Sequence, residues 1–92
     1  MEWTFEFSRK ASKFLEQHHL PDTFASEAVL LALQKLSGEA VAVDLEVLHG
    51  SWKGAYRVRR QKVRVVFSFN ATIRLVLIEV IDFRDSAYRR RK

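Results

Sequence analysis

The sequence predicts one small α+β domain with the element order β-α-α-β-β-β-(α), in which a curved antiparallel sheet carries an αα-hairpin on one face. Three observations predict it. Apolar and polar residues alternate over residues 3–7. Apolar residues recur at helical spacing from residue 9 to residue 36. Three strand-like runs separated by short turns fill residues 55–83. A chain of 92 residues has the length of a single domain, so residues 1–92 are interpreted as one unit.

The first strand and the first helix are separated by a serine. Trp3, Phe5 and Phe7 alternate with polar residues, which is typical of a half-buried strand. Ser8 then occupies the position of a helix N-cap, and the spacing of the apolar residues predicts a helix over residues 9–19.

A second helix is expected after a short link. Pro21 interrupts the first helix, Asp22 and Thr23 are candidate N-caps, and a broad apolar face extends to Leu36 before a Ser-Gly pair ends the helix. Two helices joined by so short a link are expected to form an αα-hairpin.

The second half of the chain is expected to supply most of the sheet. Residues 39–54 are irregular, and their valines and leucines fit either an edge strand or a loop. Strands are expected over residues 55–60, 62–69 and 73–83, and the last is so apolar that it fits a central strand. Residues 84–92 are expected to form a short helix or a tail.

Composition excludes several protein classes. A hydrophobic fraction of 48% argues against disorder, and the absence of cysteine excludes a disulfide framework and a cysteine-based metal site. No apolar run approaches the roughly 18 residues of a membrane span. The N-terminus alternates acidic and aromatic residues and does not resemble a signal peptide. A cytoplasmic protein without a membrane partner is expected.

Charge divides the chain into two unequal parts. Residues 1–50 hold four basic and eight acidic side chains, whereas residues 51–92 hold twelve and three, so their net charges are −4 and +9. This asymmetry predicts a polyanionic partner on one side of the fold. The alternative is a protein whose basic surface only keeps it in solution.

Three arginines are predicted to share one face of the sheet. If Val63 and Val65 face the helices, Arg64 faces away from them, and Arg57 and Arg59 join it if the hairpin register allows. Guanidinium groups offer planar forks of donors that suit phosphate. A solvated sheet face shows the same alternation, but an excess of arginine over glutamate on this face favours nucleic acid.

Aromatic residues and histidines accompany the basic region. Trp52, Tyr56 and Tyr88 fit either stacking on bases or packing in the core. His18 and His19 suit the end of the first helix, where a cation interacts well with the helix dipole, and a structural role is expected for them. The sequence has no phosphate-binding glycine loop, nucleophile elbow or metal-ligand cluster, so any catalysis would use acids, bases and arginines without a metal or cofactor.

Four segments of the chain match motifs of one family, and they follow in the family's order: Leu48-His49-Gly50, Lys53-Gly54-Ala55-Tyr56-Arg57-Val58-Arg59, Val63-Arg64-Val65-Val66-Phe67 and Ile81-Asp82-Phe83-Arg84-Asp85-Ser86-Ala87-Tyr88-Arg89-Arg90. The chain thereby resembles the RelE/ParE toxin superfamily of type II toxin–antitoxin pairs over its whole length. RelE-like members cut messenger RNA in the ribosome without a metal, and ParE-like members poison DNA gyrase.

The resemblance implies roles for five residues. Arg64 matches the arginine that stabilises the phosphate in the transition state, and Arg57 and Arg59 lie where the founding member carries lysines. Tyr88 matches a tyrosine that orients the substrate. Glu46 matches a glutamate that some members use as the base, although an exposed loop carboxylate is an equal interpretation.

The resemblance also implies an RNA-binding surface and partners. The basic residues expected to contact RNA are Lys53, Arg60, Lys62, Arg84, Arg89 and Arg90. Phe83 stands where many members carry a histidine, which removes the obvious acid. The implied function is a toxin that cuts messenger RNA on the ribosome and is neutralised by a cognate antitoxin. A ParE-like gyrase inhibitor and a non-catalytic RNA-binding domain are the alternatives.

Overall fold

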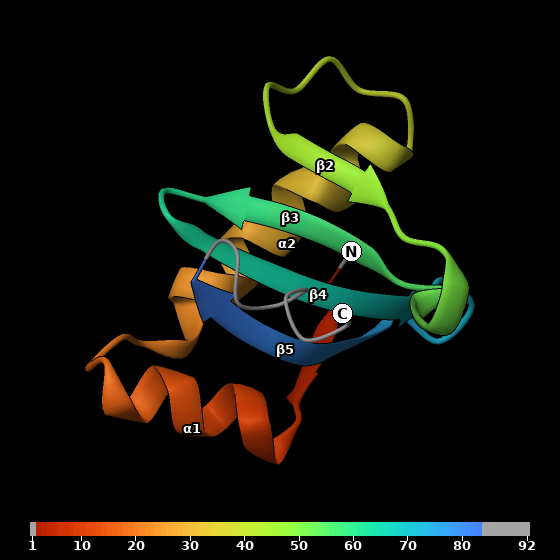
Figure 1. The fold of residues 1–92 in the computed structure, drawn as a ribbon. Helices are drawn as coiled ribbons and strands as arrows, with labels where there is room; N and C mark the ends of the chain where they lie inside the picture. Colours follow the sequence, from red (N-terminus) through yellow and green to blue (C-terminus); the bar gives the residue numbers. More distant parts are fainter. Residues whose placement is uncertain (1, 84–92) are drawn as a thin grey trace.

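The part of the chain that the structure describes contains two α-helices, five strands and a short 3-10 helix (Figure 1). The computed structural model describes residues 2–83. In chain order the elements are β1 (Thr4–Phe7), α1 (Arg9–Gln17), α2 (Asp22–Leu36), β2 (Asp44–Val47), η1 (Gly50–Trp52), β3 (Tyr56–Arg60), β4 (Val63–Asn70) and β5 (Leu75–Phe83). The α+β class is confirmed, and the observed order differs from the predicted one by an additional strand, β2, between the helices and the three predicted strands. The segment expected at residues 84–92 lies outside the described residues.

The five strands form one mixed sheet in the order β1-β5-β4-β3-β2. The β2-β3, β3-β4 and β4-β5 pairs are antiparallel, but β1 runs parallel to β5, with Thr4 beside Leu75 and Phe7 beside Ile78. The expected all-antiparallel sheet is therefore wrong at β1. Period-two alternation is the same in both kinds of pairing, so the sequence pattern of β1 could not distinguish them.

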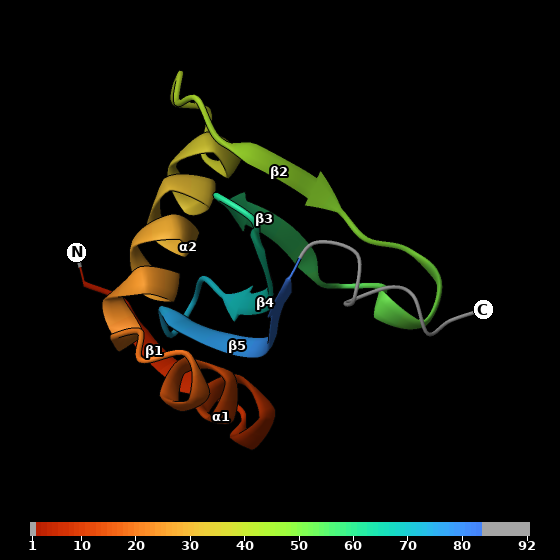
Figure 2. The same ribbon diagram turned by 60° about the vertical axis from the view of Figure 1, so that its left-hand side comes forward.

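Both helices cover the same face of the curved sheet (Figure 2). α1 packs on β5 and β1, and α2 packs on β3 and β4. We call this the inner face and the opposite one the outer face. Residues from both helices and three strands merge in one core beneath the helices, which includes Ala11, Leu15, Ala25, Val29, Ala32, Val58, Val65, Phe67, Val76 and Ile78.

The helix starts show how the sequence sets the local structure. The Ser8 hydroxyl accepts a hydrogen bond from the Ala11 N–H at 3.0 Å, which confirms the predicted N-cap, and it donates to the Glu79 carbonyl at 2.7 Å, which ties α1 to β5. The N-cap of α2 is Pro21, not Asp22 or Thr23 as expected. Proline suits this position because its backbone is held in the extended conformation and a missing N–H costs nothing there.

The irregular segment contains an edge strand. β2 pairs with β3 along its whole length, which resolves the alternative left open for residues 39–54. β5 lies between β1 and β4, as its apolar sequence predicts, and its pairing with β4 shifts register between Val66 and Phe67. Within residues 2–83 no helix is long and apolar enough to cross a membrane.

Candidate nucleic-acid interface

The register of β3 and β4 decides which side chains share the outer face. Val58 lies beside Val65, and both are fully buried in the core of the inner face. Side chains alternate between faces, so Arg59 and its cross-strand neighbour Arg64 lie on the outer face, and Arg57 joins them. The register condition on which the predicted arginine grouping depended is therefore met.

Acidic side chains lie on the same face. Asp44 of β2 is beside Arg59, and Asp82 of β5 is beside Arg64, so one row of four charged residues crosses four strands. Glu46 is beside Arg57 in the adjacent row. The expected excess of arginine over glutamate considered only β3 and β4, and it did not include the aspartates and the glutamate that their outer neighbours, β2 and β5, bring to this face.

Arg57 is buried within this face, with 7% of its surface exposed. Its Nη2 donates to Glu46 Oε1 at 2.7 Å, and its Nη1 lies 3.4 Å from Asp44 Oδ1. A small apolar cluster of Leu48, Ala55 and Val66, with Trp52 and Val80 packed against it, belongs to the same region of the sheet. Both carboxylates offset the cost of burying this guanidinium, and a phosphate at Arg57 would compete with them.

Arg59 and Arg64 are more accessible. The Arg59 Nε donates to the Gln61 carbonyl at 3.1 Å, and its Nη1 lies 3.7 Å from Asp44 Oδ2, while Arg64 is half-buried. Like charges directly opposite each other destabilise a pair of strands, and an anion above the pair reduces that cost. The pairing of β3 with β4 thus places two arginines side by side on the outer face.

The remaining basic residues of the prediction lie apart from this pair. Arg60 faces the helices, where its Nη1 donates to the Phe24 carbonyl at 2.7 Å and its guanidinium carbon lies 4.6 Å from the centre of the Phe24 ring. The contacts of Arg60 are thus with α2, not with the outer face. Lys53 follows η1 and Lys62 lies in the β3-β4 turn, and both are exposed.

Several predicted site residues lie outside the described residues: Arg84, Tyr88, Arg89 and Arg90. The predicted aromatic residues that lie within residues 2–83, Trp52 and Tyr56, are on different faces of the sheet. Tyr56 stacks on Phe67 at 5.7 Å between ring centres, which places it with the core, whereas Trp52 packs against the outer-face cluster. Within residues 2–83 no group of three or more potential metal ligands comes together.

Sequence reasoning missed Asp44 and Asp82. The signal for Asp44 was present, because Asp44 and Glu46 alternate with Leu45 and Val47 in the manner of an edge strand. Without the pairing of β2 with β3, however, nothing indicated that both carboxylates reach Arg57.

The sequence matches no protein-family model and no curated protein. The structure, by contrast, is similar to solved toxin–antitoxin proteins. A chain of the RelBE2 toxin–antitoxin complex from Mycobacterium tuberculosis is 27% identical, with 89% of this chain and 91% of that chain covered and a TM-score of 0.56.

Two further structures are similar in fold. A chain of the archaeal RelE-RelB complex from Pyrococcus horikoshii is 24% identical, covers 94% of this chain and 99% of its own, and gives a TM-score of 0.57. A chain of the Escherichia coli DinJ-YafQ complex is 19% identical, covers 95% and 99%, and gives a TM-score of 0.62. All three therefore align over nearly their full lengths.

Proposed function

We propose that this chain is the toxin of a type II toxin–antitoxin pair and that it cuts messenger RNA on the ribosome. Its structural neighbours support its place in the RelE-like toxin superfamily. The proposal takes residues 1–92 as one toxin domain and places its action in the cytoplasm, where ribosomes translate. The partners it requires are a cognate antitoxin, messenger RNA and ribosomal RNA.

The observation that carries the proposal is the Arg59-Arg64 pair on the outer face of a RelE-like fold. Residues directly opposite each other on adjacent strands have Cβ atoms about 5 Å apart, so the side chains of Arg59 and Arg64 are close enough at their base for both to reach one phosphate. Charge that develops on a phosphorane during cleavage would be stabilised by donors already in position.

The chemistry requires a base, an acid and this cationic pair. A base removes the proton of the ribose 2′-OH, the 2′-oxygen attacks the adjacent phosphorus, and the 5′-oxygen leaves with a proton from an acid. Glu46 is the candidate base, and its bond to Arg57 fixes the position of its carboxylate. Tyr88 is the candidate for orienting the substrate, and Phe83 brings no proton donor to the place of the family histidine.

A ParE-like gyrase inhibitor is the second candidate, and one observation favours it. Arg57 is buried between Glu46 and Asp44, which is the arrangement of a structural arginine and needs no substrate to explain it. With phenylalanine at position 83 as well, the chain could act by binding alone.

The antitoxin would recognise a chain whose residues 51–92 carry a net charge of +9. The three solved neighbours described above were all determined as toxin–antitoxin complexes, which supports a protein partner for this chain. An acidic segment of the antitoxin would associate more slowly as salt rises. Co-expression with the product of the neighbouring gene tests this, because a cognate pair co-purifies.

The nuclease proposal is tested by inducing the chain in bacteria and mapping cuts in a translated message by primer extension. We expect growth arrest with cuts at codons in the ribosomal A site, and Arg64→Ala should slow cleavage by roughly 10²–10³-fold, as the removal of one charge-stabilising donor does. Arg9→Ala, which removes an exposed arginine at the start of α1, is the matched control and should leave the cuts unchanged. Growth arrest with intact message and double-strand breaks in DNA would replace the nuclease by the gyrase inhibitor.

A further inference from the structure

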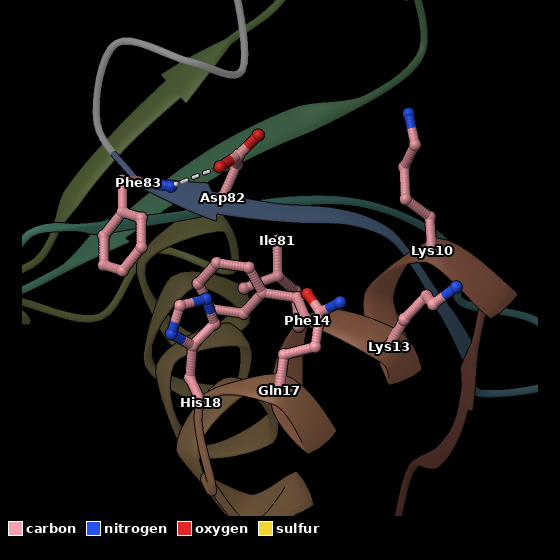
Figure 3. A pocket seen from close by; sticks show the side chains of 8 residues that line it. All are labelled: Lys10, Lys13, Phe14, Gln17, His18, Ile81, Asp82 and Phe83. Atoms are coloured by element: carbon pink, nitrogen blue, oxygen red, sulfur yellow. Dashed lines mark hydrogen bonds between the residues drawn. The ribbon is translucent and has the colours of Figure 1, made fainter.

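A pocket of about 270 Å³ lies between α1 and the C-terminal end of β5 (Figure 3). β1 pairs with β5 only as far as Ile78, so within the described residues no strand lies beside residues 79–83 on that side. α1 forms the other wall. The residues lining the pocket are Lys10, Lys13, Phe14, Gln17, His18, Ile81, Asp82 and Phe83.

The two lysines of the pocket differ from the arginines of the sheet. Lys10 and Lys13 are three residues apart on α1, so they project from the same side of the helix. Both are exposed, and within residues 2–83 neither forms an ion pair, whereas Arg57, Arg59 and Arg60 each contact a carboxylate. The ammonium groups can therefore bind an external anion without breaking an internal contact.

Aromatic rings form one end of the pocket, as Figure 3 shows. The His18 ring centre is 4.3 Å from that of Phe14 and 5.0 Å from that of Phe83. Phe14 is buried in the core and supports the other two rings, while Phe83 is 45% exposed and His18 is exposed. Aromatic side chains held in this way are stacking surfaces for nucleic-acid bases.

The pocket is continuous with the outer face. Asp82 lines the pocket and is also the last member of the row that contains Arg59 and Arg64. One Asp82 oxygen accepts the Phe83 N–H at 2.8 Å, which fixes the carboxylate at the rim. A strand of nucleic acid that crosses the sheet along this row passes Arg64 and then Asp82 before it reaches the pocket.

We propose that this pocket holds one nucleotide of single-stranded RNA, with its phosphate on Lys10 and Lys13 and its base against the rings of His18 and Phe83. The neighbouring phosphate would lie over Arg64 and Arg59. A volume slightly below the range of small-molecule sites suits one base or phosphate and is too small for a whole cofactor. The inference rests on the proposed function and extends the RNA path beyond the residues that the family motif indicates.

The electrostatic half is tested by measuring the affinity of the full chain for a short fluorescein-labelled oligoadenylate RNA at several salt concentrations. Lys10→Gln with Lys13→Gln should reduce the slope of log K against log salt by about 1.4, because each lysine that neutralises a phosphate of a single strand contributes about 0.7. Arg9→Gln removes the same kind of charge from the same helix outside the pocket and should keep the wild-type slope. An unchanged slope in the double variant overturns the proposal.

The stacking half is tested with the same RNA. His18→Ala and Phe83→Ala should each weaken binding about 5- to 150-fold and leave the salt slope unchanged, because stacking releases no counterions. Circular dichroism identifies any variant that does not fold. Because His18 is exposed and follows α1, the affinity of the His18→Ala variant can be measured without changing a residue of β5. Wild-type affinity in a folded His18→Ala variant overturns the placement of the base.

The two proposals fail in different ways. If the wild type cuts translated message and the double lysine variant binds the oligoadenylate like Arg9→Gln, the pocket assignment is wrong and the nuclease stands. If the wild type leaves message intact while the double variant shows the reduced salt slope, the nuclease is wrong and the pocket stands.

Discussion

The two faces of the sheet use the same backbone in opposite ways. On the inner face Val58, Val65 and Phe67 have no exposed surface and pack beneath the helices. On the outer face carboxylates of β2 and β5 flank the arginines of β3 and β4, and the buried residues are a small apolar cluster and Arg57. The inner face therefore supplies most of the stability, and the outer face can vary its charges while the fold is retained.

Two arginines of one strand make this difference concrete. Arg57 and Arg60 are three residues apart on β3 and project to opposite faces. Arg60 donates to the backbone of α2 and so fastens the helix to the sheet, whereas Arg57 binds carboxylates of the neighbouring edge strand. Residue type alone does not distinguish a structural cation from one near a binding surface.

The largest effect is expected on the rate of RNA cleavage when a carboxylate of the outer face is replaced. Glu46→Gln keeps the shape of the side chain and removes its charge, so if Glu46 is the base, cleavage of translated message should fall by roughly 10²–10⁴-fold. Affinity for RNA should rise or stay constant, because a carboxylate that competes for Arg57 is gone. Glu39→Gln, at an exposed carboxylate after α2, is the control. Equal cleavage by both variants would make Glu46 a structural residue.

The next effect concerns the stability of the inner face. Phe67→Ala removes a fully buried ring and should lower the free energy of unfolding by about 3–5 kcal/mol in a denaturant titration. Ile73→Ala, at a side chain that is 63% exposed in the β4-β5 turn, should change it by less than about 0.5 kcal/mol. A small decrease for Phe67→Ala would show that the core is not concentrated beneath the helices.

A smaller decrease in stability is expected on the outer face. Arg57→Met removes the cation that contacts Glu46 and one of the two cations that contact Asp44, the other being Arg59. Because both carboxylates are more than half exposed, water offsets part of the effect. We expect the free energy of unfolding to fall by about 1–2 kcal/mol. Arg59→Met, which breaks a longer and more exposed contact, should cost less. If the two variants were equally stable, the burial of Arg57 would contribute nothing.

The smallest effect is expected where α1 meets the sheet. Ser8→Ala removes the N-cap and the bond to the Glu79 carbonyl and should lower the free energy of unfolding by about 1 kcal/mol in the same titration. Ser12→Ala, on the exposed side of the same helix, should be neutral or slightly stabilising because alanine favours helices. A neutral Ser8→Ala would mean that packing alone fixes the start of α1.

The sequence alone determined both helices, the strands β1, β3, β4 and β5, and the alternation of faces. Local signals are sufficient for this, because the Ser8 cap, the apolar spacing of the helices and the period-two strands each depend on residues close together in the chain. The same alternation predicted that Arg57, Arg59 and Arg64 could share a face, and the motif order indicated the toxin superfamily.

Only the tertiary structure decided which strands are neighbours. The parallel pairing of β1 with β5, the carboxylates beside Arg57 and the contact of Arg60 with α2 all join residues far apart in sequence. The pocket that joins Lys10 and Lys13 to the end of β5 arises in the same way. Periodicity in the sequence predicts the direction in which a side chain projects from its own strand or helix. The residue that this side chain contacts depends on how the whole chain packs. The charge balance of a surface depends on the same packing.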